Sequence, residues 1–154
     1  RFEGLIDVPV EFVRAARAAS VRDLGSVARL AQALAALPDE RLEPIHTAYI
    51  RASRLAEKEE AAASLDSELL TEPAEQEVAK ALEQVEPEIA AALDTGDFEA
   101  AVEAGAKLGP MLDRFFEEVL VMAEDAPTRQ NRLRLLLDVR DTLGSLGDLA
   151  QIPR

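Results

Sequence analysis

The sequence repeats apolar residues at helical spacing, and this periodicity is the feature that most constrains the fold. Apolar positions recur three and four residues apart, and no window alternates apolar and polar residues long enough to form a β-strand. Aromatic residues make up only 4% of the chain and Trp is absent, so the core must consist mainly of Leu, Val, Ile and Ala. We therefore predict an all-α fold.

Proline, aspartate and glycine residues divide the chain into about seven predicted helices. We expect these helices to cover residues 7–19, 20–37, 39–60, 71–93, 98–107, 111–123 and 127–146. Side chains suited to helix capping stand at three of the starts: Asp7, Ser20 with Asp23, and Thr71. The length suits one ordinary domain. Within it we predict a helical connector over residues 1–64 and a helical bundle over residues 65–154.

Acidic residues are concentrated in the middle of the chain, which has a formal net charge of −13. Residues 59–109 contain fourteen acidic and two basic residues, whereas residues 1–58 contain eight acidic and nine basic ones. The overall charge disfavours nucleic-acid binding, because such binding usually depends on Lys and Arg that neutralise phosphates. The flanks are nearly neutral and could still present a local basic surface, with the acidic middle directed away from any RNA.

One predicted helix carries basic residues opposite its apolar side. Arg51, Arg54 and Lys58 are three and four residues apart, so they share one face. The other face carries Leu42, Ile45, Ala48, Ala52, Leu55 and Ala56. One hypothesis is that the basic face contacts RNA phosphates. A solvated helix face is the interpretation that the pattern alone favours.

In the last predicted helix, basic residues fall on both the apolar and the polar side. Arg129 and Arg140 fall within its apolar side and Arg132 lies at the edge, so we expect them to pair with carboxylates and help packing. The carboxylates considered as partners are Glu117, Glu118, Glu124 and Asp125. Asn131 and Arg134 fall on the polar side, where an Asn can read a base edge. Arg134 could instead pair with Asp138, four residues later.

Two adjacent aromatic residues, Phe115 and Phe116, are expected to lie in the core. Met122 is expected to share the face of Phe115, and Leu120 the face of Phe116. Stacking of an RNA base on Phe116 is the alternative.

The sequence offers little for catalysis. There is no Cys, and His46 is the only His, which we expect at the surface. Glu43 and His46 form a single Glu-x-x-His spacing, too little for a helical metal site. We therefore predict no catalytic residue, metal site or cofactor in this chain, and no membrane span. Because the chain begins with Arg1 rather than Met, we expect it to be part of a longer protein.

Four sequence blocks resemble the C-terminal domain of bacterial glycyl-tRNA synthetase beta subunits. They are Leu-Thr-Glu-Pro-Ala-Glu at 70–75, Gly-Asp-Phe-Glu-Ala-Ala at 96–101, the Phe-Phe block at 112–125 and Arg-Gln-Asn-Arg-Leu-Arg-Leu-Leu at 129–136. The resemblance is good over residues 65–149 and fainter over residues 8–58. Tyr49, Ile50 and Arg54 stand where the family pattern has Asn, Lys and Asn.

This resemblance implies a DALR-like anticodon-binding bundle in a cytoplasmic ligase. The partners it implies are tRNA(Gly) and an alpha subunit, in a tetramer of two alpha and two beta subunits, with no membrane or DNA partner. The alpha subunit would bind glycine and ATP with magnesium. The candidate RNA-binding residues are Arg51, Arg54, Lys58, Arg129, Asn131, Arg132 and Arg134. The alternatives are a helical protein-interaction or scaffold domain and the anticodon-binding domain of an arginyl-tRNA synthetase.

Overall fold

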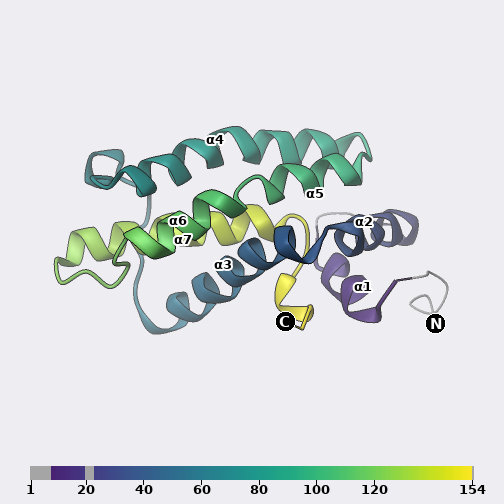
Figure 1. Cartoon of the computed structure of the whole chain (residues 1–154), viewed down its shortest axis with the longest axis horizontal. Coiled ribbons are helices and arrows are strands. Elements are labelled where there is room, and N and C mark those ends of the chain that lie inside the picture. Colours follow the sequence, from purple (N-terminus) through teal and green to yellow (C-terminus); the bar gives the residue numbers. More distant parts are fainter. Residues whose placement is uncertain (1–7, 20–22, 154) are drawn as a thin grey trace.

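Residues 8–19 and 23–153 are described by the computed structural model (Figure 1), and within these ranges the chain is all helical. The seven α-helices of this part are α1 (Val10–Arg17), α2 (Leu24–Ala36), α3 (Asp39–Lys58), α4 (Pro73–Asp94), α5 (Phe98–Ala106), α6 (Gly109–Glu118) and α7 (Ala126–Gly144). Two short 3-10 segments, η2 (Ser67–Leu69) and η3 (Leu149–Gln151), complete it. The prediction of an all-α fold is confirmed.

Aspartate side chains cap three of these helices, as local sequence signals require. Asp23 accepts a hydrogen bond from the Ser26 backbone N–H at 2.8 Å, and Asp97 and Asp125 cap α5 and α7 in the same way. The prediction of Thr71 as a cap is wrong. Glu72 takes that position, and Glu75 accepts from the Glu72 backbone N–H at 3.1 Å, as in a capping box. The predicted caps Asp7 and Ser20 lie outside the described residues.

Helix α7 forms the centre of the fold. It lies between α4 on one side of the molecule and α3 on the other, and contacts both (Figure 1). Its buried residues are Asn131, Arg132, Leu133, Leu135, Leu136, Val139, Thr142 and Leu143. These residues point in most directions around the helix, so α7 has no single apolar face.

Helices α1 and α2 lie at one end of the molecule (Figure 1). Helix α1 packs on α2, and α2 packs on α5. Helix α6 packs on both α3 and α4. The division of the chain into a connector over residues 1–64 and a bundle over residues 65–154 stays a prediction. Helix α3, which precedes that division, nevertheless packs mainly on α7, which follows it.

The segment after α7 turns back onto the N-terminal half of the chain. Gly147 has a φ of 133°, and the Asp148 backbone N–H donates to the Ala15 carbonyl at 2.9 Å. His46 lies 2.7 Å from the Ile152 carbonyl through Nε2 and is buried, so the expectation of a surface histidine is wrong. The C-terminal segment covers this part of α3, and the sequence periodicity of α3 carries no sign of that cover.

Helix α6 ends at Glu118, earlier than predicted, and residues 119–125 form an irregular connection that we call the α6–α7 linker. The Leu120 carbonyl accepts a hydrogen bond from Arg132 at 2.6 Å, which replaces the bonding of a further helical turn. Within the described ranges, every helix is too short or too polar to pass through a lipid bilayer.

Candidate nucleic-acid interface

The exposed side of α3 carries a basic stripe, Arg51, Arg54 and Lys58. All three residues are exposed, as the helical spacing predicts, while Ile45 and Ala52 on the opposite side are buried. None of the three cations forms an ion pair with another residue of the described ranges. Their charges are therefore available to an external anion.

Most other basic side chains in the described ranges have carboxylate partners. Arg41 pairs with Glu103 at 2.6 Å, and Arg114 pairs with Glu77 at 2.7 Å. Lys107 pairs with Glu88 at 2.9 Å. The three cations of the basic stripe differ from these paired cations by their lack of carboxylate partners.

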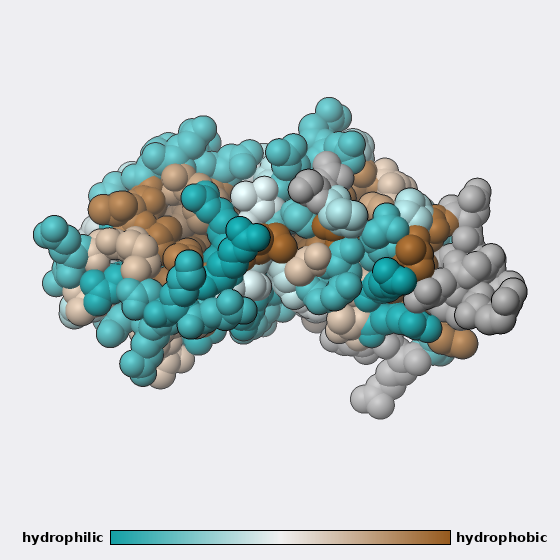
Figure 2. Space-filling model, turned by 90° about the horizontal axis from the view of Figure 1, so that it is seen from below, coloured by the Kyte–Doolittle hydropathy of each residue, from teal (hydrophilic) through white to brown (hydrophobic). Residues whose placement is uncertain are grey.

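An apolar hollow of about 430 Å³ adjoins the basic stripe. Its lining comes from α3, α6 and the α6–α7 linker: Arg51, Arg54, Leu55, Phe116, Val119, Leu120, Val121 and Met122. Leu120 is 68% exposed and Met122 is 40% exposed. Figure 2 shows apolar surface gathered at the end of the molecule where α6 meets the linker, next to strongly hydrophilic side chains. Such exposed apolar surface is typical of a binding site.

Phe115 and Phe116 connect this hollow to the core. Phe115 is fully buried, as predicted, and meets the Phe116 ring edge to face with 5.5 Å between centroids. Phe116 packs against the core but is only half-buried. The guanidinium carbon of Arg51 lies over the Phe116 ring, 4.5 Å from its centroid. The expected burial of Met122 and Leu120 beside these rings is wrong, because α6 ends before either residue.

Asn131 is buried, and its predicted position on a polar helix face is wrong. Its Oδ1 accepts from the Asp66 backbone N–H at 2.8 Å, and its Nδ2 donates to the Asp66 carbonyl at 3.0 Å. The Asn131 amide therefore forms both of these hydrogen bonds with the backbone of a single residue, Asp66. This pairing holds the connection between α3 and α4 against α7.

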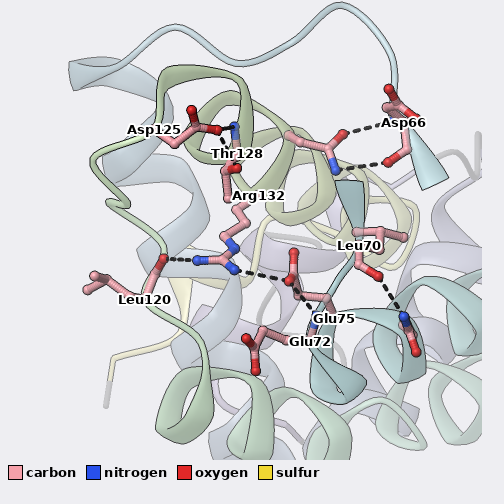
Figure 3. Close-up of polar contacts among 10 residues, drawn as sticks. Asp66, Leu70, Glu72, Glu75, Leu120, Asp125, Thr128 and Arg132 are labelled. Atoms are coloured by element: carbon pink, nitrogen blue, oxygen red, sulfur yellow. Dashed lines mark hydrogen bonds and ion pairs between the residues drawn. The ribbon is translucent and has the colours of Figure 1, made fainter. Parts of the chain in front are cut away.

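Arg132 is also buried, and it joins three segments (Figure 3). It donates to Glu75 of α4 at 3.1 Å and to the Leu120 carbonyl of the α6–α7 linker at 2.6 Å. Glu75 is fully buried. Glu75 Oε2 and Arg132 Nε have no hydrogen-bond partner among the described residues. The arrangement makes Arg132 a structural link rather than a surface cation.

Three further arginines of α7 have protein partners. Arg134 pairs with Asp138 at 2.9 Å, as the i, i+4 spacing predicts, and Arg140 lies 3.2 Å from Asp141. Arg129 donates to the Ala123 carbonyl at 3.0 Å, and its nearest carboxylate is Glu59 at 4.0 Å. The expectation that Arg129 and Arg140 pair with carboxylates is confirmed. Their partners are Glu59 and Asp141, which differ from the expected ones.

The structure thus separates the seven candidate RNA-binding residues. Arg51, Arg54 and Lys58 lie together at the surface, whereas Asn131 and Arg132 are buried and Arg129 and Arg134 are engaged by other groups. Leu120 and Met122 were missed as site residues. Their apolar character is visible in the sequence, but their exposure depends on where α6 ends.

The comparisons with known proteins agree with the motifs in the sequence. Residues 45–153 match the DALR anticodon binding domain family. The glycine–tRNA ligase beta subunit of Citrifermentans bemidjiense is 37% identical over 145 residues, which are 94% of this chain and 21% of that protein. The beta subunit of Anaeromyxobacter dehalogenans is 38% identical over 147 residues, 92% of this chain and 21% of the relative. That of Leptothrix cholodnii is 34% identical over 154 residues, 99% of this chain and 21% of the relative.

This chain spans about a fifth of the length of these curated relatives. The family match covers α4 to α7 and most of α3, which includes the basic stripe and the apolar hollow. The resemblance to glycyl-tRNA synthetase beta subunits is confirmed by the identities over nearly the whole chain. The chain therefore belongs to the DALR anticodon binding domain family.

Proposed function

We propose that this chain binds the anticodon stem-loop of tRNA(Gly) as part of a glycine–tRNA ligase beta subunit. The family match and the names of the relatives support the class of ligand, and those names support glycine rather than arginine. The observation that carries the proposal is the basic stripe of unpaired cations, Arg51, Arg54 and Lys58, beside the apolar hollow.

The chemistry of this surface suits a single-stranded RNA loop. Loop phosphates fix the register of the RNA on a protein, and unpaired loop bases are recognised by stacking and hydrogen bonds. The basic stripe supplies phosphate contacts, and the apolar hollow supplies a place where an unpaired base is shielded from water. No buried acid–base group is needed for this task, because binding positions the tRNA without a chemical step.

The exposed acidic residues disfavour RNA binding on one side of the molecule. Helix α4 carries exposed carboxylates such as Glu83 and Glu86 and lies on the opposite side of the molecule from α3 (Figure 1). Repulsion by these carboxylates disfavours RNA on the α4 side and leaves the α3 side as the docking face.

The proposal places catalysis outside this chain. An alpha subunit would bind glycine and ATP with magnesium and carry out aminoacylation, in a tetramer of two alpha and two beta subunits. The role of the chain would be to hold the anticodon end of the tRNA while its acceptor end reaches that subunit.

The test is binding of the chain to tRNA(Gly) and to transcripts with altered second and third anticodon bases, at several salt concentrations. We expect tighter binding of the glycine anticodon. The double variant Arg51→Ala, Arg54→Ala should bind more weakly. The salt slope of log K should fall by about 0.7 to 0.9 for each phosphate that the variant no longer neutralises.

Lys80→Ala is the matched control, because Lys80 is an exposed cation on α4 without an ion-pair partner in the described ranges. It should leave both affinity and salt slope unchanged. Equal affinity for all the anticodons, together with no effect of the double variant, would contradict the proposed function and favour a scaffold role.

A further inference from the structure

The contact between Arg51 and Phe116 distinguishes Arg51 from the other cations of the basic stripe. Its guanidinium carbon lies 4.5 Å from the ring centroid, and the ring is held edge to face by the buried Phe115. Arg54 lines the same apolar hollow without an aromatic partner in the described ranges. The two arginines therefore have the same charge and different surroundings.

We propose that the Arg51 guanidinium is the platform on which one unstacked base of the anticodon loop stacks. This inference rests on the proposed function and adds a subsite to it. The base would occupy the apolar hollow with Leu120 and Met122 as its side wall. Phe116 would support the Arg51 guanidinium on the side away from the base. Arg54 would act as a point charge on an adjacent phosphate.

The arrangement of the rings and the guanidinium leads to this assignment. Arg51 lies over one face of the Phe116 ring, and Phe116 packs against the core, so on that face the guanidinium and not the ring is presented to a base. Arg51 itself is exposed and lines the hollow. A guanidinium is planar and weakly hydrated, and its plane stacks on nucleobases. Support from an aromatic ring reduces the conformational freedom that Arg51 would lose on binding.

The wall of the hollow has the character expected for a base. Leu120 and Met122 are two of the three large hydrophobic side chains that are well exposed in the described ranges. The hollow volume of about 430 Å³ falls within the usual size of small-molecule sites, about 300 to 1,000 Å³. The hydrogen bond from Arg132 to the Leu120 carbonyl holds the wall in place, so the subsite exists before RNA binds.

Charge identifies the occupant as a nucleotide rather than a neutral apolar segment of a protein. Arg51 and Arg54 both line the hollow, and neither has a carboxylate partner among the described residues. A base linked to phosphates satisfies the apolar wall and both cations at once, which a neutral side chain does not.

The test compares two conservative substitutions that keep the charge. Arg51→Lys removes the planar group and should weaken tRNA(Gly) binding roughly tenfold, with an unchanged salt slope. Arg54→Lys keeps a point charge and should change the affinity by no more than about twofold. Both residues are exposed, so melting curves of the two variants should match that of the parent chain.

A second measurement identifies the stacked base. Stem-loop RNAs that lack one loop base at a time are bound to the parent chain and to Arg51→Lys. At one loop position we expect the missing base to weaken binding to the parent chain, and Arg51→Lys to cause no further loss on that RNA. A merely structural role of Arg51 would weaken binding of every RNA by the same factor, and that result would overturn the inference.

The failures of the two proposals are distinguishable. In one outcome, Arg51→Ala and Arg54→Ala weaken binding, but Arg51→Lys has the same small effect as Arg54→Lys. The proposal of base stacking on Arg51 is then wrong, and phosphate binding by the basic stripe is retained. If none of these variants affects RNA binding, both proposals fail. If Leu120→Ser impairs assembly with an alpha subunit and leaves RNA affinity intact, the hollow is a protein contact and the inference is overturned.

Discussion

At the scale of single residues, the buried pair of Arg132 and Glu75 has the largest predicted effect on stability. Glu75 is fully buried, so removal of its partner leaves a charge without compensation. We expect Arg132→Met to lower the free energy of unfolding by about 3–5 kcal/mol in urea titrations. The double variant Arg132→Met, Glu75→Leu should recover a large part of that loss, because it removes the stranded charge.

Arg114→Met provides the comparison for this pair. The Arg114 and Glu77 side chains are 51% and 38% exposed, and their charges are screened by water. The variant should cost at most about 1 kcal/mol. Similar losses for Arg114→Met and Arg132→Met would mean that burial does not control the strength of these pairs here.

At the scale of elements, the start of α7 depends on its cap. Asp125 accepts hydrogen bonds from the Thr128 hydroxyl at 2.6 Å and from the Thr128 backbone N–H at 3.1 Å. These bonds hold the pKa of Asp125 below its ordinary value of 3.8, since they favour the ionised carboxylate. A lowered pKa in the folded state means that the cap stabilises the fold fully above the unfolded pKa. That stabilisation is lost as the pH falls through the folded pKa.

Asp125→Ala should therefore lower the Tm near neutral pH, and the difference from the parent chain should shrink as the pH falls below about 4. Thermal unfolding followed by circular dichroism across this pH range measures the effect. Glu124→Ala is the control, because Glu124 is exposed and its side chain caps no helix in the described ranges. A Tm difference for Asp125→Ala that stays constant down to low pH would contradict the assigned role of the carboxylate.

At the scale of the whole molecule, the C-terminal segment ties α1 to α3 near the middle of the long axis, away from the α6–α7 linker at one end (Figure 1). Gly147 has a positive φ, and a Cβ there would meet the Ala15 carbonyl. We expect Gly147→Ala to lower the free energy of unfolding by about 1–3 kcal/mol. The affinity of the remaining folded protein for tRNA should be unchanged, because the apolar hollow is distant.

Gly96→Ala is the control for this experiment, because it measures the cost of a positive φ without a steric contact. Gly96 also has a positive φ, of 77°, but no atom lies within 4 Å of its added Cβ. Its cost should be only about 1 kcal/mol. An equal loss for the two variants in chemical unfolding would show that the close approach to Ala15 contributes nothing.

Features that depend on neighbouring residues in sequence could be predicted. The turn at Gly96 is a local signal, and the structure has it. The capping signal of Ser20 with Asp23 located the start of α2 to within a few residues, and Asp23 is the residue that caps this helix. The two faces of α3 follow from its period, because one side packs on the core and the other meets solvent. The exposure of Arg51, Arg54 and Lys58 was predictable for the same reason.

Features that depend on distant segments could not be predicted. The period of α7 implies a polar face for Asn131, but the connection to α4 covers that face and pairs with it through Asp66. The burial of His46 depends on the return of Ile152. The exposure of Leu120 depends on the hydrogen bond that Arg132 makes beyond the end of α6.

Local sequence is enough to specify that the chain is helical, where most helices begin and which side of α3 is basic, because each of these depends on contacts within a few residues. Long-range packing, in contrast, encloses α7 and pairs Arg132 with Glu75. It also brings Phe116, Arg51 and the α6–α7 linker together around one hollow. Each of these features requires groups far apart in the chain to share space, and their burial or exposure follows from that packing.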